Sequence, residues 1–275
     1  NQQMTNQPLT RLNNGITMPL LGLGVYDMYE ATAERAVLDA LEIGYRLIDT
    51  ASLYNNETEV GAAINKSSVP RNEIFVTTKV GDADHGFDET LRAFDTSLQK
   101  LQMDYVDLYL VHWPIKGKRK ETWLALEKLY SDKRVRAIGV ANYLIPFLNE
   151  LATYASLVPM LNQVEFTPWL FQEELMKYCQ QKNIQLQSYS PITRGKKFND
   201  SRLLELCKKY DKTPAQIILQ WNIAHGISTI PKSSNKLRLQ ENFGSLLFNL
   251  SADDVIFMDS FNENFRICED PAEMF

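Results

Sequence analysis

The chain has 275 residues, of which 44% are hydrophobic and 23% are charged, a composition that excludes a disordered or fibrous protein. At about 150 residues per domain, this length suits two modest domains or one large α/β barrel. The net charge of −5 excludes a global basic field that would attract nucleic acid or an anionic membrane. Because no stretch matches a membrane helix of about 20 apolar residues or a signal peptide, we expect a cytoplasmic protein that binds neither nucleic acid nor membranes.

The three cysteines, Cys179, Cys207 and Cys268, are far apart in the sequence. An odd number of cysteines without any CxxC spacing argues against a disulfide framework and against a zinc site. We therefore expect reduced thiols that are mostly buried, and no bound metal.

The sequence begins with a hairpin signal and continues as alternating strands and helices. Within residues 9–20, Asn13-Asn14-Gly15 lies between apolar flanks, and an Asn-Gly pair tolerates the positive φ of a tight hairpin. Eight short apolar runs then predict strands that begin at Leu20, Arg46, Ile74, Val106, Val135, Met160, Ile184 and Ile227. Helical periodicity predicts helices at residues 30–41, 56–65, 91–101, 122–130, 146–155, 172–181, 201–210, 213–226, 236–244 and 251–261.

Each predicted strand is followed by at least one helix, which is the inventory of a (β/α)8 barrel of about 250 residues. The strands are almost continuously apolar, as expected of parallel strands covered on both faces. We reject a doubly wound dinucleotide fold, because the segment from Gly22 to Asp27 has Asp where the third glycine of that fingerprint belongs. No linker divides the chain, so we expect a single barrel domain over residues 1–275, with tails at 1–7 and 263–275.

Catalytic groups of such barrels lie at the carboxyl ends of the strands. Every predicted strand except the first ends in polar or ionisable groups: Asp49 with Tyr54 in the following loop, Lys79, His112-Trp113, Asn142, Gln163 to Glu165, Tyr189-Ser190 and Lys232-Ser233. A single residue of this kind is explained equally well by a solvated strand end or a structural ion pair. Seven such ends on one rim favour an active site.

The residue types on this rim indicate a particular chemistry. A lysine between an aspartate and a tyrosine favours the phenolate, and we expect it to lower the tyrosine pKa from its usual value of about 10. A neutral histidine nearby can orient a carbonyl oxygen by hydrogen bonding. The set suits proton donation to a carbonyl oxygen, and reduction then also requires a hydride source such as a nicotinamide or a flavin.

Two clusters of basic residues need separate interpretations. Lys232-Ser233, with Arg238 in the first turn of the next helix, predicts an anion site made of two cations and helix N-terminal amides. With a nicotinamide cofactor, this site predicts a 2′-phosphate and therefore NADPH. We interpret the basic run at 116–120 as a solvated loop.

Two long motifs resemble the signatures of the aldo-keto reductase superfamily. The first is Gly44-Tyr45-Arg46-Leu47-Ile48-Asp49-Thr50-Ala51, followed by Glu57 and Val60-Gly61, and the second is Ile230-Pro231-Lys232-Ser233 with Arg238 and Asn242. The similarity extends from the N-terminal hairpin to about Asn262. Within the superfamily, the chain resembles compact prokaryotic-type members, the 2,5-diketo-gluconate reductase-like and glyoxal reductase-like enzymes.

The resemblance implies a role for each matching residue. The catalytic tetrad is Asp49, Tyr54, Lys79 and His112, in which Tyr54 is the general acid, Lys79 lowers its pKa, Asp49 holds Lys79, and His112 orients the substrate oxygen. The cofactor is NADPH, with Asn142 and Gln163 at the carboxamide, Tyr189 on the nicotinamide, Ser190 and Ile192 near the pyrophosphate, Lys232, Ser233 and Arg238 at the 2′-phosphate, and Glu241 and Asn242 at the adenine.

Two residues depart from the pattern of the family. Ala141 stands where the family usually has Ser, which removes one contact to the carboxamide and weakens cofactor binding by about 1 kcal/mol. Gly81 stands where the family typically has Trp, so we expect a wider substrate pocket whose remaining aromatic walls are Tyr26 and Trp113. The short segment after Asn262 predicts limited coverage of the pocket by the C-terminus.

We therefore expect NADPH-dependent reduction of aldehydes and ketones, with hydride transfer from nicotinamide C4, Tyr54 as general acid, and a small carbonyl compound as the substrate of a monomeric enzyme. One alternative is a non-catalytic NADPH-binding regulatory protein. Another is a Schiff-base lyase of the aldolase type that uses Lys79 or Lys232, although it would leave Asp49, Tyr54 and His112 without a joint role.

Overall fold

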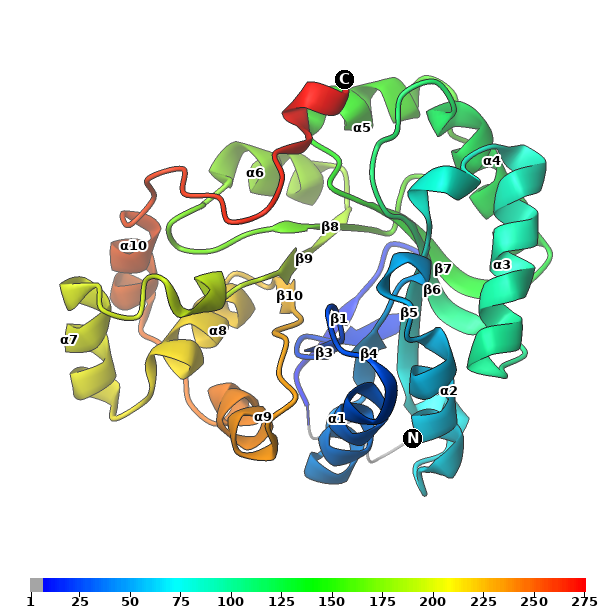
Figure 1. Ribbon diagram of the computed structural model, residues 1–275. Coiled ribbons are helices and arrows are strands. Elements are labelled where there is room, and N and C mark those ends of the chain that lie inside the picture. The colour runs from blue at the N-terminus through cyan, green and yellow to red at the C-terminus, as the bar shows by residue number, and fades with distance from the viewer. Residues whose placement is uncertain (1–6) are drawn as a thin grey trace.

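The computed structural model describes residues 7–275 and contains an eight-stranded parallel sheet that curls into a barrel (Figure 1). The strands are β3 (Leu23–Gly24), β4 (Leu47–Asp49), β5 (Phe75–Val80), β6 (Val106–Val111), β7 (Val135–Ala141), β8 (Leu161–Glu165), β9 (Gln185–Tyr189) and β10 (Ser228–Thr229). Each strand pairs in parallel with the next along the chain, and bridges from Leu21 to Thr229 and from Gly24 to Lys232 join the first strand to the last. The predicted (β/α)8 barrel is confirmed.

Helices surround the strands, as Figure 1 shows. They are α1 (Glu30–Ile43), α2 (Glu57–Lys66), α3 (Phe87–Leu101), α4 (Arg119–Ser131), α5 (Ile145–Ala152), α6 (Glu173–Gln181), α7 (Ser201–Tyr210), α8 (Pro214–Ala224), α9 (Lys236–Phe243) and α10 (Ala252–Asp259). Both α3 and α4 begin one turn before their predicted starts, because their first turns are polar and give no apolar periodicity. No helix in the described part of the chain is both long and apolar enough to cross a membrane.

Several helix ends follow from local side-chain chemistry. Thr213 caps α8 by accepting a hydrogen bond from the backbone N–H of Gln216, whose side chain in turn accepts from the backbone N–H of Thr213. The hydroxyl of Ser251 caps α10 by accepting a hydrogen bond from the backbone N–H of Asp254. Gly44 ends α1 with a φ of +130°, a region that glycine adopts without steric cost. The predicted caps are therefore present.

A two-stranded hairpin, β1 (Leu9–Arg11) with β2 (Thr17–Pro19), lies across the amino-terminal ends of the barrel strands. Thr10 donates a hydrogen bond of 2.7 Å to Gln185 at the start of β9. Asn14 donates one of 3.0 Å to the carbonyl of Arg136 at the start of β7. The hairpin covers this end of the barrel, and the site lies at the other.

The interpretation of residues 116–120 as a solvated loop is wrong for Arg119, which belongs to α4 and is only 9% exposed. Its guanidinium donates two hydrogen bonds of 2.8 Å to Glu150 and one of 3.1 Å to the carbonyl of Pro114. The contact with Glu150 spans 31 positions, so no local pattern in the sequence reveals it.

The prediction of a tail at residues 263–275 is also wrong. Backbone N–H groups of Glu263 and Phe265 donate to the carbonyl of Trp169, and those of Ile267 and Cys268 donate to the side chain of Glu165. The segment therefore runs over the carboxyl ends of the barrel strands, ending near α5 (red in Figure 1). Of the other predicted tail, residues 1–6 lie outside the described residues.

Candidate active site

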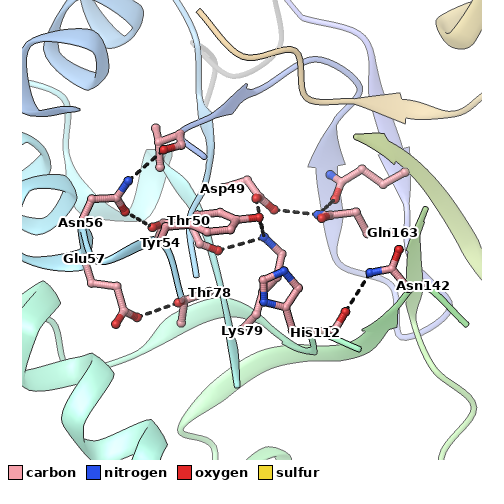
Figure 2. A network of polar contacts seen from close by, with 12 residues as sticks. Asp49, Thr50, Tyr54, Asn56, Glu57, Thr78, Lys79, His112, Asn142 and Gln163 are labelled. Carbon is pink, nitrogen blue, oxygen red and sulfur yellow. Dashed lines mark hydrogen bonds and ion pairs between the residues drawn. The ribbon is translucent and has the colours of Figure 1, made fainter. Parts of the chain in front are cut away.

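Lys79 forms the centre of a buried polar cluster at the carboxyl ends of β4 and β5 (Figure 2). Its ammonium donates to Oδ1 of Asp49 at 2.6 Å, to the carbonyl of Thr50 at 3.0 Å and to the hydroxyl of Tyr54 at 3.1 Å. These three acceptors use all three N–H groups of an ammonium. Asp49 pairs with Thr77 across β4 and β5, and alternation along β5 places Lys79 on the same face, inside the barrel.

The cluster keeps both Lys79 and Tyr54 protonated. Burial disfavours the ammonium of Lys79, but the charge of Asp49 and the neighbouring Tyr54 outweigh burial, so the pKa of Lys79 lies above its ordinary value. Burial raises the pKa of Tyr54, and Lys79 opposes that rise without cancelling it. The expectation of a lowered Tyr54 pKa is thus wrong in sign, because lost hydration outweighs the nearby ammonium. Tyr54 retains a proton that it can donate.

His112 lies beside Tyr54, with 5.6 Å between the two ring centroids. Burial lowers the pKa of His112 well below its ordinary value, and the ammonium of Lys79 adds to this shift. The imidazole is therefore neutral, as the sequence predicts. The imidazole of His112 and the phenol of Tyr54 thus lie side by side in the site.

Three of the predicted cofactor residues form a second network beside the tetrad. The hydroxyl of Tyr189 donates to Oδ1 of Asn142 at 2.6 Å, and Nδ2 of Asn142 donates to the carbonyl of His112 at 2.9 Å. Nε2 of Gln163 donates to Oδ2 of Asp49 at 2.7 Å. The carboxamide-binding residues that the sequence predicts are thus held by the backbone and side chains of the tetrad itself.

Asn56 supports the site and was missed by sequence reasoning. Its fully buried side chain donates to the carbonyls of Val25 and Met28 at 2.8 and 2.9 Å and accepts from Thr50 at 2.6 Å (Figure 2). These contacts tie the loop after β3 to the loop that carries Tyr54. The position of Asn56 inside the first motif is the signal that could have identified it.

A cavity of about 840 Å³ opens above the tetrad, within the size range of small-molecule sites. Predicted site residues supply more than half of its lining: Tyr26, Asp49, Tyr54, His112, Trp113, Asn142, Gln163, Tyr189, Ser190, Ile192, Lys232 and Arg238. Lys79 lies beneath it and is 0% exposed. Sequence reasoning missed the lining by Arg194, Phe198 and residues 267–269, which belong to segments without a motif.

Gly81 is not among the residues that line this cavity, and its place in the substrate pocket stays a prediction. A Cβ at Gly81 would lie 3.1 Å from Oδ2 of Asp84, 3.7 Å from the hydroxyl of Ser52 and 3.9 Å from Leu53. Of these neighbours, Leu53 lines the cavity, so Gly81 lies next to the cavity wall.

Two of the residues predicted to form the anion site, Lys232 and Arg238, line the cavity, and the backbone N–H of Arg238 is already capped by Asn235. Nζ of Lys232 lies 3.7 Å from Oδ2 of Asp27, and both side chains are about half exposed, at 46% and 59%. Ser233, Glu241 and Asn242 do not line the cavity; Ser233 accepts from the backbone N–H of Asn235.

A parallel barrel with a buried Lys–Asp pair, a protonated tyrosine and a neutral histidine at a cavity of this size defines an oxidoreductase of the barrel type. Residues 20–263 match the model of the Aldo/keto reductase family. The glyoxal reductase of Bacillus subtilis is 46% identical over 265 residues, which cover 96% of each chain. The chain therefore belongs to the aldo/keto reductase family.

Solved structures agree with this assignment. MGS-M4, an aldo-keto reductase from a deep-sea metagenome library of the Medee basin, superimposes with a TM-score of 0.93 at 42% identity and covers 96% of this chain and 98% of its own. A variant of Gox0644 in complex with NADPH superimposes with a TM-score of 0.92 at 36% identity and covers 96% and 97% of the two chains.

Proposed function

We propose that this protein reduces aldehydes and ketones to alcohols with NADPH and that Tyr54 protonates the carbonyl oxygen. The observation that carries the proposal is the position of the Lys79 ammonium, 2.6 Å from Asp49 and 3.1 Å from the Tyr54 hydroxyl, at the floor of the cavity. Its relative from Bacillus subtilis bears the name glyoxal reductase, so small dicarbonyl compounds are the first substrates to test.

The residues that line the cavity suit NADPH. Asn142, Gln163 and Tyr189 present amide groups and an aromatic ring beside the tetrad, and Lys232 and Arg238 add two cations to the lining. The amides would hold the carboxamide, Tyr189 would stack on the nicotinamide, and the two cations would hold the 2′-phosphate. Bound in this way, NADPH supplies a hydride from C4 of its nicotinamide.

Ser190 and Ile192 also line the cavity, and we place the pyrophosphate beside them. Ser190 has a φ of +47°, an uncommon conformation for a residue with a side chain. Ser233, Glu241 and Asn242 lie outside the cavity lining, so their proposed contacts with the phosphate and adenine require the cofactor to extend past the cavity.

Tyr54 and His112 perform the protonation step. The Tyr54 hydroxyl accepts from Lys79, which leaves its own proton available for a carbonyl oxygen in the cavity. Neutral His112 orients that oxygen by hydrogen bonding. As the carbonyl oxygen gains negative charge, the Tyr54 proton moves to it, and the Lys79 ammonium stabilises the phenolate that remains.

A Schiff-base lyase is less well supported by the same geometry. A nucleophilic lysine must be a neutral amine within reach of substrate. Lys79 is fully buried, donates three hydrogen bonds, and has a raised pKa because Asp49 and Tyr54 outweigh the effect of burial. It is therefore a charged positioning group for Tyr54 rather than a nucleophile.

The test is NADPH oxidation, followed at the absorbance band of reduced nicotinamide, with glyoxal, methylglyoxal and a panel of aldehydes and ketones. Tyr54→Phe should lower kcat by about 100- to 10,000-fold and leave the NADPH dissociation constant unchanged. Tyr26→Phe is the matched control, because its ring lies 5.4 Å from that of Tyr54 and lines the same cavity without a hydrogen bond to Lys79.

Two results would contradict the proposal. Turnover that survives in Tyr54→Phe would exclude Tyr54 as the acid. NADPH binding without turnover of any carbonyl compound in the wild type would favour a regulatory protein instead.

A further inference from the structure

Glu165 ends β8 with a carboxylate that the proposed chemistry does not use. The side chain is almost completely buried, with 1% of the residue exposed. Oε2 accepts the backbone N–H of Ile267 at 2.9 Å, and Oε1 accepts that of Cys268 at 3.1 Å. Each oxygen thus holds one of two consecutive N–H groups, 102 and 103 positions further along the chain.

No ion pair neutralises Glu165 within the described residues. Arg266 precedes the bound residues; its charge favours the carboxylate of Glu165 but does not cancel the effect of burial, which raises the pKa of Glu165. The ion pair that Arg266 forms is with Asp270, at 3.7 Å. A buried carboxylate without a paired cation is costly unless hydrogen bonds stabilise it. The two N–H groups of residues 267 and 268 supply this stabilisation, so the carboxylate and the segment depend on each other.

The segment that Glu165 binds forms part of the cavity wall. Ile267, Cys268 and Glu269 all line the cavity that contains Tyr54, His112 and Trp113. At one side, Sγ of Cys268 lies 3.7 Å from the hydroxyl of Ser190, next to the end of β9. Glu269 lies near Asp82, which follows β5. Burial raises the pKa of Asp82, and the negative charge of Glu269 adds to this rise. Residues 267–269 therefore form part of the wall of the cavity that contains Tyr54 and His112.

The last residues of the chain have a separate attachment. The carbonyl of Met274 accepts a hydrogen bond of 3.4 Å from Arg119, and the ring of Phe275 lies 5.3 Å from that of Phe147. Residues 267–269 lie between this attachment and the hydrogen bonds that the backbone N–H groups of Glu263 and Phe265 donate to the carbonyl of Trp169. Among the described residues, the Glu165 carboxylate is the group that accepts the hydrogen bonds donated by the backbone of residues 267 and 268.

We propose that Glu165 is a positioning residue for the substrate, because its carboxylate holds residues 267–269 as the wall of the substrate pocket. This inference rests on the proposed reduction of carbonyl compounds. Glu165 acts through the segment and does not touch the reacting atoms, so its loss should weaken substrate binding and leave the protonation step intact.

The first test is Glu165→Gln in the full chain. The amide places an N–H group against one of the two backbone N–H groups, so one hydrogen bond is lost and the wall loosens. We expect KM for carbonyl substrates to rise about tenfold, the equivalent of one hydrogen bond. Both kcat with its pH profile and the NADPH dissociation constant should stay within about twofold, since the tetrad is unchanged.

Hydrogen exchange provides a readout that does not depend on activity. The amides of Ile267 and Cys268 should exchange faster in Glu165→Gln, and amides of β6 should not change. Glu263→Gln is the matched control, because it makes the same change in the same segment at a side chain that is 44% exposed. A second variant serves if Glu165→Gln fails to fold. Ile267→Pro removes one of the two backbone N–H groups that Glu165 accepts, and it should raise KM by a similar factor.

The outcomes separate this inference from the proposed function. A wild type that reduces no carbonyl compound contradicts both. An active wild type contradicts the inference alone if exchange at 267–268 is unchanged, if KM is unchanged, or if kcat, NADPH affinity and thermal stability fall together in Glu165→Gln.

Discussion

Nε2 of Gln163 donates a hydrogen bond of 2.7 Å to Oδ2 of Asp49, and Lys79 donates to the other oxygen of the same carboxylate. Asp49 is 1% exposed and Gln163 is 2% exposed. The buried carboxylate is thus held from two sides, by an ammonium and by an amide. In the proposed complex Gln163 also faces the nicotinamide, so one residue links cofactor binding to the position of the tetrad.

Gln163→Leu should lower the free energy of unfolding by about 1–3 kcal/mol, because it leaves one oxygen of a buried carboxylate without a donor. Chemical denaturation measures this change. The effect should shrink when Asp49→Asn is present, since the charge that requires the donor is then gone. Equal losses in both backgrounds would mean that Gln163 stabilises the fold independently of Asp49.

His85 should make stability depend on pH. The residue is 3% exposed, neither ring nitrogen has a hydrogen-bond partner within the described residues, and burial with the nearby Lys118 lowers its pKa to about 4. In the unfolded chain His85 binds a proton at about pH 6.5. The contribution of His85 to the free energy of unfolding should therefore fall as the pH drops from about 6.5 to 4, and this contribution should stay constant at lower pH.

The size of this effect is about 3 kcal/mol, from about 1.4 kcal/mol for each pH unit between the two pKa values. His85→Met removes this titration, so the difference in unfolding free energy between wild type and variant should change over this interval. His112 titrates in both proteins and cancels from the difference. Parallel stability curves for the two proteins would contradict the prediction.

Asp27→Asn should tighten NADPH binding about 2- to 5-fold, the equivalent of an exposed ion pair. Asp27 lies 3.7 Å from Lys232, so the substitution frees the ammonium for the 2′-phosphate. Its φ of +57° is also accessible to Asn. Fluorescence titration with NADPH measures the change, and NADH, which lacks that phosphate, is the control. A similar gain with both cofactors would place Lys232 elsewhere than at the 2′-phosphate.

Arg119→Leu should destabilise the protein by about 1–3 kcal/mol, because it removes the donors to Glu150 and to the carbonyl of Pro114 in a mostly buried setting. Lys116→Ala, an exposed change in the same basic run, should stay within about 0.5 kcal/mol of wild type. Thermal unfolding of both variants compares them. Equal stabilities would restore the interpretation of the whole run as a solvated loop.

Residues next to each other in the sequence determined most of the barrel, and they placed the residues of the proposed tetrad in one group. Apolar runs and helical periodicity arise from local spacing, so β5 through β9 and α7 were predicted nearly to the residue. Because carboxyl ends of parallel strands meet at one rim, the polar residues that follow each run could be grouped without coordinates. Asp49, Lys79 and His112 belong to this group.

The tertiary structure decided what depends on contacts between distant segments and on burial. The hydration that Tyr54 loses comes from the whole fold, so the sign of its pKa shift could not be read from the neighbouring Lys79. The hold of Glu165 on residues 267 and 268 spans more than 100 positions. The sequence alone determined which side chains lie at the carboxyl ends of the strands. Only the folded structure determined the burial and the hydrogen-bond partners of these side chains, because desolvation and long-range contacts exist only after folding.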